Sequence, residues 1–443
     1  RRVLFRSNCE GILEFDTCVI HYGETDGADE IKLTKTASLV IRRCTIENHS
    51  YDKNTFIDAD AVEQEIGFYN CEFINCCWFL STGSDLRLVE CKMINLGERF
   101  LSVQYDGKTT ITRCEFSFHN KPAFIPEKNE TEIISCKMAD FSECVMKGTL
   151  RIPSVELGAE TVKNADWRAS KFLRMQCGTI TNSTFYGLEN LLFGNYGNSI
   201  KISQSIFEHC FNIIDSHGLV AVEDCRFDHC VRIGNDLHKG SQILNSQFND
   251  CFCQLVSTGC DGGIRISFCE FNNWQAPNED ASILDSSGSL AGTMLLFQCA
   301  KRDGRQSTIE HCTFNGVTAH QYFLIKGYVY EKIKGAVVYV RKCNFANCTT
   351  ERTSGKIIKE YDHYFTAIFN AQKELNVVSI SECRGLDKVN QENGYNDDIK
   401  IKSKSSTGAY IGMTAAIAVA GVPGLLAAKA IKNASTDDDI HVE

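Results

Sequence analysis

A short pattern of residues recurs through most of this chain at a nearly constant spacing. In its clearest copies an anchor residue, Cys or Ser, is followed two positions later by Phe and preceded three positions earlier by Ile or Val. The consecutive anchors Ser183, Ser205, Cys225, Ser246 and Cys269 are 22, 20, 21 and 23 residues apart. A period of this size indicates a solenoid, in which each repeat packs against its neighbours along the chain.

Fourteen copies of the pattern can be placed. Position −3 relative to the anchor is apolar in every copy, and position +2 is Phe, Ile or Met in all but the last, which has Gly385. The predicted anchors are Cys18, Cys44, Cys71, Cys91, Cys114, Cys136, Ser183, Ser205, Cys225, Ser246, Cys269, Cys312, Cys343 and Cys383.

The spacing within one copy predicts the path of the backbone. Positions −5 and −3 are two residues apart, as are the anchor and +2, so each pair alternates like a strand with one buried face. The step from −3 to the anchor is odd, so both can point inward only if the chain turns between them. Position +4 is usually Asn, Asp or His, which tolerate a left-handed backbone and predict a second turn. Apolar pieces such as Leu255-Val256 then supply a third short strand.

Three short strands in each repeat, with no helical period between them, describe one coil of a parallel β-helix. The pattern apolar-x-x-Cys-x-Phe-x-Asn resembles repeats of the right-handed parallel β-helix superfamily, the fold of pectate lyases, from residue 9 to about residue 388. We therefore expect an all-β, right-handed parallel β-helix solenoid of about 14–15 coils, roughly 70 Å long at ~4.8 Å per coil. A leucine-rich solenoid is the second interpretation, ranked lower because regular leucines are missing. The resemblance implies a fold and no activity, because lyases, adhesins and scaffolds share it.

The spacing lengthens at four places. We interpret the 47 residues from Cys136 to Ser183 as two coils, with a degenerate copy near Val162–Trp167. The longer steps after Cys269 predict insertions, and insertions in a solenoid often gather on its functional face. The predicted insertions are Gln275–Asp285, Cys299–Ser307 and Thr349–Asp362.

The 23 cysteines are an odd number in a chain too large to need disulfides for stability, and 16 of them occupy the anchor or position +5. This pattern predicts buried, reduced thiols that pack as small apolar groups, and a reducing compartment or an anaerobic host. Metal sites need clustered ligands rather than one cysteine per coil, so we expect no metal and no cofactor.

His209 and His229 occupy position +4 in successive copies, and Asp250 occupies it in the next. We therefore expect these three residues to lie side by side at one corner of the coil. A cation-binding or acid–base site is one interpretation. A row of turn residues that cap backbone groups, as Asn does at the same position elsewhere, is the favoured one.

The sequence contains no catalytic signature. Polysaccharide lyases need clustered carboxylates with a basic residue, and glycoside hydrolases need two carboxylates about 5–9 Å apart. Glu208, Glu223, Asp224 and Asp228 fall on neighbouring copies, but the motifs typical of hydrolases are missing. The net charge of −10, spread along the chain, argues against nucleic acid as a partner. We expect a non-catalytic scaffold that binds a protein or glycan ligand on its face, with a carbohydrate-active enzyme as the alternative.

The composition changes after residue 388. We interpret 8–388 as the β-helix, 389–407 as a polar linker, 408–433 as a small-residue apolar segment and 434–443 as an acidic tail. Small residues that recur every fourth position predict a short helix or helical hairpin that tethers the chain to a membrane or self-associates, with packing on the last coil as the alternative. These residues are Gly408, Gly412, Ala416, Ala420, Gly424 and Ala428.

Residues 1–7 are left out of the fold prediction. Arg2–Ser7 resembles the translation of a sequencing adapter, so we expect the natural N-terminus, with any export signal, to be missing.

Overall fold

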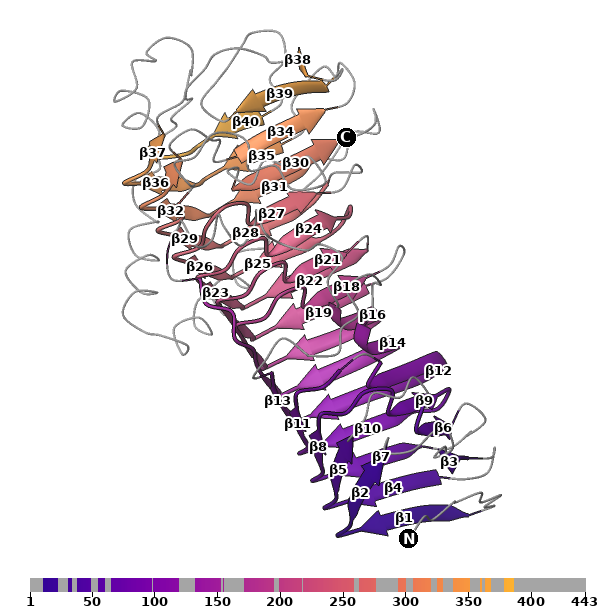
Figure 1. The fold of residues 1–443 in the computed structure, drawn as a ribbon. Helices are drawn as coiled ribbons and strands as arrows, with labels where there is room; N and C mark the ends of the chain where they lie inside the picture. The colour runs from indigo at the N-terminus through magenta and orange to yellow at the C-terminus, as the bar shows by residue number, and fades with distance from the viewer. Residues whose placement is uncertain are drawn as a thin grey trace, which may run out of the picture. The chain divides into compact units, whose positions relative to one another are not determined.

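The chain folds as an all-β parallel solenoid, in which successive strands alternate between stacked sheets (Figure 1). The expected all-β class and parallel stacking are therefore confirmed. The computed structural model describes residues 11–22, 31–33, 38–48, 55–59, 65–97, 99–118, 132–152, 154, 171–194, 199–216, 218–258, 263–275, 294–299, 306–319, 325–329, 338–350, 359–360, 363–367 and 378–385.

The strands within the described residues form a 25-stranded sheet A, a 13-stranded sheet B and a separate pair. Sheet A contains β1 (Ile12–Asp16), β3 (Ile31–Lys32), β4 (Ser38–Arg42), β6 (Ile57–Ala59), β7 (Ile66–Tyr69), β9 (Leu80–Thr82), β10 (Leu86–Val89), β12 (Leu101–Thr112), β14 (Glu132–Ser142), β16 (Lys171–Thr181), β18 (Leu192–Gly194), β19 (Ser199–Ser203), β21 (Ile214–Ser216), β22 (Leu219–Glu223), β24 (Gly234–Leu237), β25 (Gln242–Leu244), β27 (Val256–Thr258), β28 (Arg265–Ser267), β30 (Leu295–Cys299), β31 (Ser307–Glu310), β34 (Ile325–Val329), β35 (Val338–Arg341), β38 (Lys359–Glu360), β39 (His363–Ala367) and β40 (Val378–Ser381). Sheet B contains β2 (Val19–Tyr22), β5 (Thr45–Asn48), β8 (Glu72–Ile74), β11 (Lys92–Ile94), β13 (Glu115–Ser117), β15 (Val145–Lys147), β17 (Thr184–Tyr186), β20 (Ile206–Glu208), β23 (Arg226–Asp228), β26 (Gln247–Asn249), β29 (Glu270–Asn272), β32 (Thr313–Asn315) and β36 (Asn344–Ala346). The pair is β33 (Thr318–Ala319) with β37 (Thr349–Thr350).

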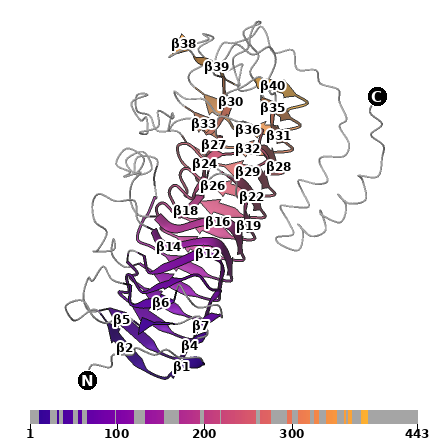
Figure 2. The same cartoon turned by 90° about the vertical axis from the view of Figure 1, so that its right-hand side faces the viewer.

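Each coil runs from sheet A to sheet B and back to sheet A. In one coil β22 is followed by β23 and then by β24, and these strands pair in parallel with β25, β26 and β27 of the next coil. Sheet A thus holds two rows of strands. The long strands β12, β14 and β16 connect the rows, because each continues from the third strand of one coil into the first strand of the next (Figure 2).

The first turn of every coil lies at position −1, immediately before the anchor. The backbone φ angle at this position is between 49° and 57°, which is the left-handed region, although none of the residues is glycine. This turn produces the odd step between −3 and the anchor that the sequence requires. The residues are Thr17, Arg43, Asn70, Glu90, Arg113, Glu143, Asn182, Gln204, Asp224, Asn245, Phe268, His311, Lys342 and Glu382.

The anchor side chain stabilises this turn through hydrogen bonds within and between coils. The Ser246 hydroxyl donates to the Leu244 carbonyl oxygen at 2.9 Å and accepts the Cys225 backbone N–H of the preceding coil at 3.2 Å. A cysteine anchor makes the same local bond, since the Cys225 thiol donates to the Glu223 carbonyl oxygen at 3.3 Å. A thiol and a hydroxyl can each donate one hydrogen bond and accept others. This shared property explains why either Cys or Ser can occupy the anchor position.

The second turn repeats this construction at positions +4 and +5. Among the described residues, position +4 has φ between 50° and 65° in nine coils, and a buried cysteine commonly follows it. The Cys230 thiol, for example, donates to the Asp228 carbonyl oxygen at 3.3 Å and approaches the Phe207 carbonyl oxygen of the preceding coil at 3.4 Å. The nine residues are Asn75, Asn95, Gly187, His209, His229, Asp250, Asn273, Gly316 and Asn347.

One predicted anchor is wrong. Cys136 lies in β14, where it pairs with Val103 and Met175 in sheet A, and the anchor of this coil is Cys144. The Cys144 backbone N–H donates to the Ser183 hydroxyl at 3.2 Å. Strand β15 pairs directly with β17, which leaves no coil between them in sheet B, so the expected two coils are one. The predicted degenerate copy lies outside the described residues.

Phenylalanine at position +2 forms a continuous aromatic ladder inside the solenoid. Neighbouring ring centroids are 4.7–5.0 Å apart and their planes lie within 14° of parallel. The distance matches the spacing of paired strands, so in-register pairing and ring stacking support one another. The ladder consists of Phe185, Phe207, Phe227, Phe248, Phe271, Phe314 and Phe345.

The predicted C-terminal elements lie outside the described residues. These are the polar linker 389–407, the apolar segment 408–433 with its six small residues, and the acidic tail 434–443. A search of the described part of the chain found no helix with the length and apolar character needed to cross a membrane.

The equivalence of Ser and Cys at the anchor can be tested at Ser246. Ser246→Ala would leave the buried Cys225 N–H without its acceptor, so we expect the free energy of unfolding to fall by about 1–3 kcal/mol. Ser246→Cys keeps a group that can donate and accept, and should cost less than about 1 kcal/mol. Urea unfolding of both variants checks this, and equal losses would contradict the assigned role of the anchor.

Candidate functional site

His209, His229 and Asp250 occupy one corner of three consecutive coils, at position +4. Their φ angles are 53°, 53° and 50°, so each forms the left-handed turn of its coil. The two imidazole centroids are 4.8 Å apart, with their planes inclined by 34°. Asp250 accepts a hydrogen bond from the Asn273 side-chain amide at 3.2 Å. The structure thus places the three residues in a row along the stacking direction.

The His209 ring has contacts that a simple turn residue does not need. Its Nδ1 accepts the Ile152 backbone N–H at 3.2 Å, and its Nε2 lies 3.7 Å from a Glu208 carboxylate oxygen. The Tyr186 ring meets it edge-on with centroids 5.4 Å apart. Because Nδ1 accepts a hydrogen bond, the ring is neutral and carries its proton on Nε2. Burial, and next the neighbouring His229, lower the pKa of His209.

The row can be compared with the requirements of a metal centre. No group of three or more His, Cys, Asp or Glu side chains within the described ranges is arranged to hold a metal ion. His229 Nδ1 is buried and has no hydrogen-bond partner among the described residues. The arrangement therefore favours a row of turn residues over a cation site.

Residues 148–152, which we name the crossing segment, leave their own coil after β15 and run over the next. The Gly148 N–H donates to the Tyr186 carbonyl oxygen at 2.7 Å, and the Leu150 N–H donates to the Gly187 carbonyl oxygen at 3.0 Å. A Cβ atom on Gly148 would lie 2.2 Å from the Gly187 carbonyl oxygen, so this close crossing requires glycine. Sequence reasoning missed the segment because it missed the anchor Cys144, which places Gly148 at position +4, in the same position as Gly187 of the next coil.

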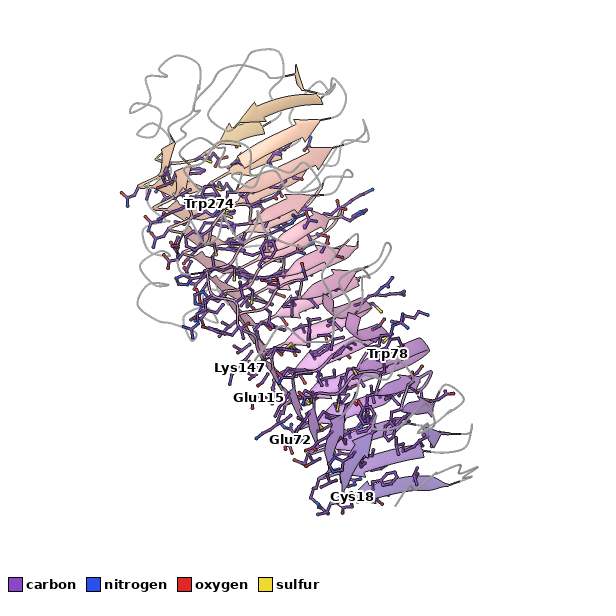
Figure 3. All side chains as sticks on the ribbon, viewed as in Figure 1. Cys18, Glu72, Trp78, Glu115, Lys147 and Trp274 are labelled. Atoms are coloured by element: carbon purple, nitrogen blue, oxygen red, sulfur yellow. The ribbon has the colours of Figure 1, made fainter. Side chains whose placement is uncertain are left out.

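A second feature, which we name the amide face, covers the outward side of sheet B from β23 to β32. Its residues alternate with the buried phenylalanines of the ladder and pair in register from coil to coil. They are Arg226, Asp228, Gln247, Asn249, Glu270, Asn272, Thr313 and Asn315. The repeated Phe-Asn pairs of the sequence are the signal that could have revealed this face. Figure 3 shows the same side of sheet B nearer the N-terminus, where Glu72, Glu115 and Lys147 are labelled.

Side chains of the amide face hold one another in place. The Asn249 amide donates to Asp228 Oδ1 at 2.8 Å, and the Asn272 amide donates to Asn249 Oδ1 at 3.0 Å. In the neighbouring column the Gln247 amide donates to Glu270 at 3.3 Å. Asp228 also accepts from Arg226 Nε at 2.7 Å. The result is an ordered array of amides and carboxylates that leaves part of each group exposed to solvent.

The four carboxylates noted in the sequence lie in different surroundings. They are Glu208, Glu223, Asp224 and Asp228. Glu208 lies opposite Asp228 in adjacent strands of sheet B, and Asp224 forms the first turn of its coil. Glu223 lies in sheet A, 3.8 Å from the Lys201 ammonium group. Sequence reasoning missed Glu270. Burial raises the pKa of this carboxyl group, and the hydrogen bond from Gln247 acts in the opposite direction without cancelling the increase. A raised pKa is typical of a general acid, so Glu270 is the most suitable described carboxyl for that role.

The twenty cysteines whose side chains the structure describes are all free, and all but Cys18 and Cys177 are buried. Burial raises the pKa of the Cys225 and Cys253 thiols to about 12. A thiol with such a pKa is almost entirely protonated at neutral pH, whereas the thiolate is the reactive nucleophile. The cysteines of the repeat therefore belong to its construction.

Comparison with protein families, curated proteins and solved structures finds no match to this chain. The geometry of its own surfaces is therefore the guide to its function.

The thiols provide a test of the packing. At pH 8 the thiolate fraction of Cys225 is about 10⁻⁴, so we expect alkylation of Cys225 to be at least about 100-fold slower than that of the exposed Cys18. Mass spectrometry of iodoacetamide-treated protein checks this, and in denaturant the rates should converge. Rapid native alkylation of Cys225 would show that the anchors are accessible.

Proposed function

We propose that this chain is a non-catalytic solenoid scaffold and that its amide face binds a glycan. The observation that supports this is the array of Asp228, Asn249 and Asn272, whose side chains are already ordered by mutual hydrogen bonds. Ordered polar groups lose little conformational entropy on binding. Amide and carboxylate groups at regular intervals suit the closely spaced hydroxyl groups of a sugar chain.

A glycan fits this face better than a protein does. Stable protein interfaces are centred on apolar and aromatic side chains that become fully buried. The eight outward residues of the amide face include none, because the phenylalanines of the same strands point into the core. A protein ligand is accordingly the second candidate for this surface.

We also propose a superfamily for the solenoid and a role for the C-terminal segment. Three strands per coil and the Cys-x-Phe pattern support a right-handed winding and membership of the right-handed parallel β-helix superfamily. The small residues of 408–433 support a C-terminal helix or hairpin that tethers the scaffold to a membrane or self-associates.

A carbohydrate-active enzyme is the alternative function, and one observation favours it. Glu270, whose pKa is raised, lies on the same face as Asp228, which accepts a hydrogen bond from Arg226. A pair of carboxyl groups with unlike environments is the usual requirement for glycoside hydrolysis. The alternative makes Glu270 the acid and Asp228 the base or nucleophile.

Substitution on the amide face should separate these functions. A glycan array with wild-type protein identifies the ligand, and Asn249→Ala and Asn272→Ala should each weaken its binding by about tenfold, as expected for a lost hydrogen bond. Ser117→Ala, at the same position of β13, is the matched control and should bind normally. The proposal fails if neither asparagine variant differs from the control. Release of reducing ends that disappears in Glu270→Gln would establish the enzyme instead.

The C-terminal proposal requires its own experiment. We expect the full chain to co-sediment with liposomes or to form oligomers, and a variant that lacks residues 408–433 to do neither. Flotation and analytical ultracentrifugation of both proteins measure this. Identical behaviour of the two proteins would exclude tethering and self-association through this segment.

A further inference from the structure

Three backbone N–H groups of the crossing segment donate hydrogen bonds to neighbouring coils. The bond at its C-terminal end, from Ile152, differs from the other two in its acceptor. Gly148 and Leu150 donate to backbone carbonyl oxygens, which accept at every pH. Ile152 donates instead to His209 Nδ1, and an imidazole nitrogen accepts a hydrogen bond only while it carries no proton. The far end of the segment is therefore attached through a group that can accept a proton, and histidine is the side chain whose ordinary pKa lies nearest to neutral pH.

The surroundings of His209 oppose its protonation. The ring is largely buried, with 14% of its side chain exposed. Burial lowers its pKa most, followed by His229 from the next coil, and Arg151 of the crossing segment acts in the same direction. The Glu208 carboxylate on the same coil opposes them, and the Tyr186 ring packs from the preceding coil. In the attached state the neutral ring is thus favoured.

We propose that His209 is a pH-sensitive switch that holds the crossing segment against the solenoid at neutral pH and releases it on acidification. A proton on Nδ1 turns the acceptor into a donor that faces the Ile152 N–H, so the bond is lost. The new positive charge also lies beside Arg151 and His229. Release exposes the Ile152 side chain, which is fully buried in the attached state.

The direction of the pH dependence follows from linkage. In the attached state the pKa of His209 lies below the ordinary histidine value of about 6.5, to which it returns once the segment is released. The released state therefore binds more protons, and attachment is complete above about pH 6.5 and weakens as the pH falls below it.

Hydrogen exchange of the intact chain tests this switch. Peptides that cover the crossing segment are followed by mass spectrometry between pH 8 and pH 5, with rates corrected for the intrinsic effect of pH. We expect protection of the Ile152 amide to fall at least tenfold across this range. Peptides from β25 and β28 should stay protected throughout, which separates local release from unfolding.

Three variants test whether His209 causes the loss of protection at low pH. His209→Asn, which places the residue of other coils at this corner, should give weak protection that no longer depends on pH. His229→Asn removes the neighbouring ring that lowers the pKa of His209, and should move the transition to higher pH. His21→Asn, on a half-exposed histidine of β2, should behave like the wild type. The proposal is overturned if the wild type shows no transition, if His209→Asn retains it, or if His229→Asn leaves its midpoint unchanged.

Discussion

The structure depends on a turn in which a left-handed residue precedes a buried cysteine or serine. A left-handed conformation costs a non-glycine residue roughly 1–2 kcal/mol, and this chain adopts it at the first turn of coil after coil. The parallel ladder offsets the cost, because the N–H of the turn residue also bonds to the next coil, as Asp224 does to the Leu244 carbonyl oxygen. The anchor side chain closes the turn from inside. A coil can keep this geometry only while its neighbours share it.

Much of this fold follows from the sequence, because the turn imposes a periodic pattern. The odd step from −3 to the anchor predicted the first turn, and the Asn, Asp and His of position +4 predicted most of the second. The pattern failed where two local matches competed. Cys136 and Cys144 each have an apolar residue at −3 and a methionine at +2, and only the pairing of Met146 with Phe116 and Phe185 distinguishes them. That pairing is a property of neighbouring coils, which one copy cannot reveal.

The candidate surfaces were predictable to different degrees. The row of His209, His229 and Asp250 followed from the period alone. The contact of Ile152 with His209 did not, because it joins residues 57 positions apart through a segment that leaves the repeat. The amide face required the register of β23, β26 and β29, since isolated Phe-Asn pairs do not show which side chains meet. Outward side chains are the ones that can meet a ligand on such a scaffold, because the inward side chains are packed in its core.

The central claim is that one uninterrupted stack of coils carries both the crossing segment and the amide face. Its most direct test is the distance between spin labels introduced as non-natural residues at positions 92 and 226, both outward at position +1 of sheet B. Five coil steps separate these positions when Cys144 is the anchor. At ~4.8 Å per step we predict a single distance of about 24 Å. A distance about 5 Å longer, or a broad distribution, would contradict this stack.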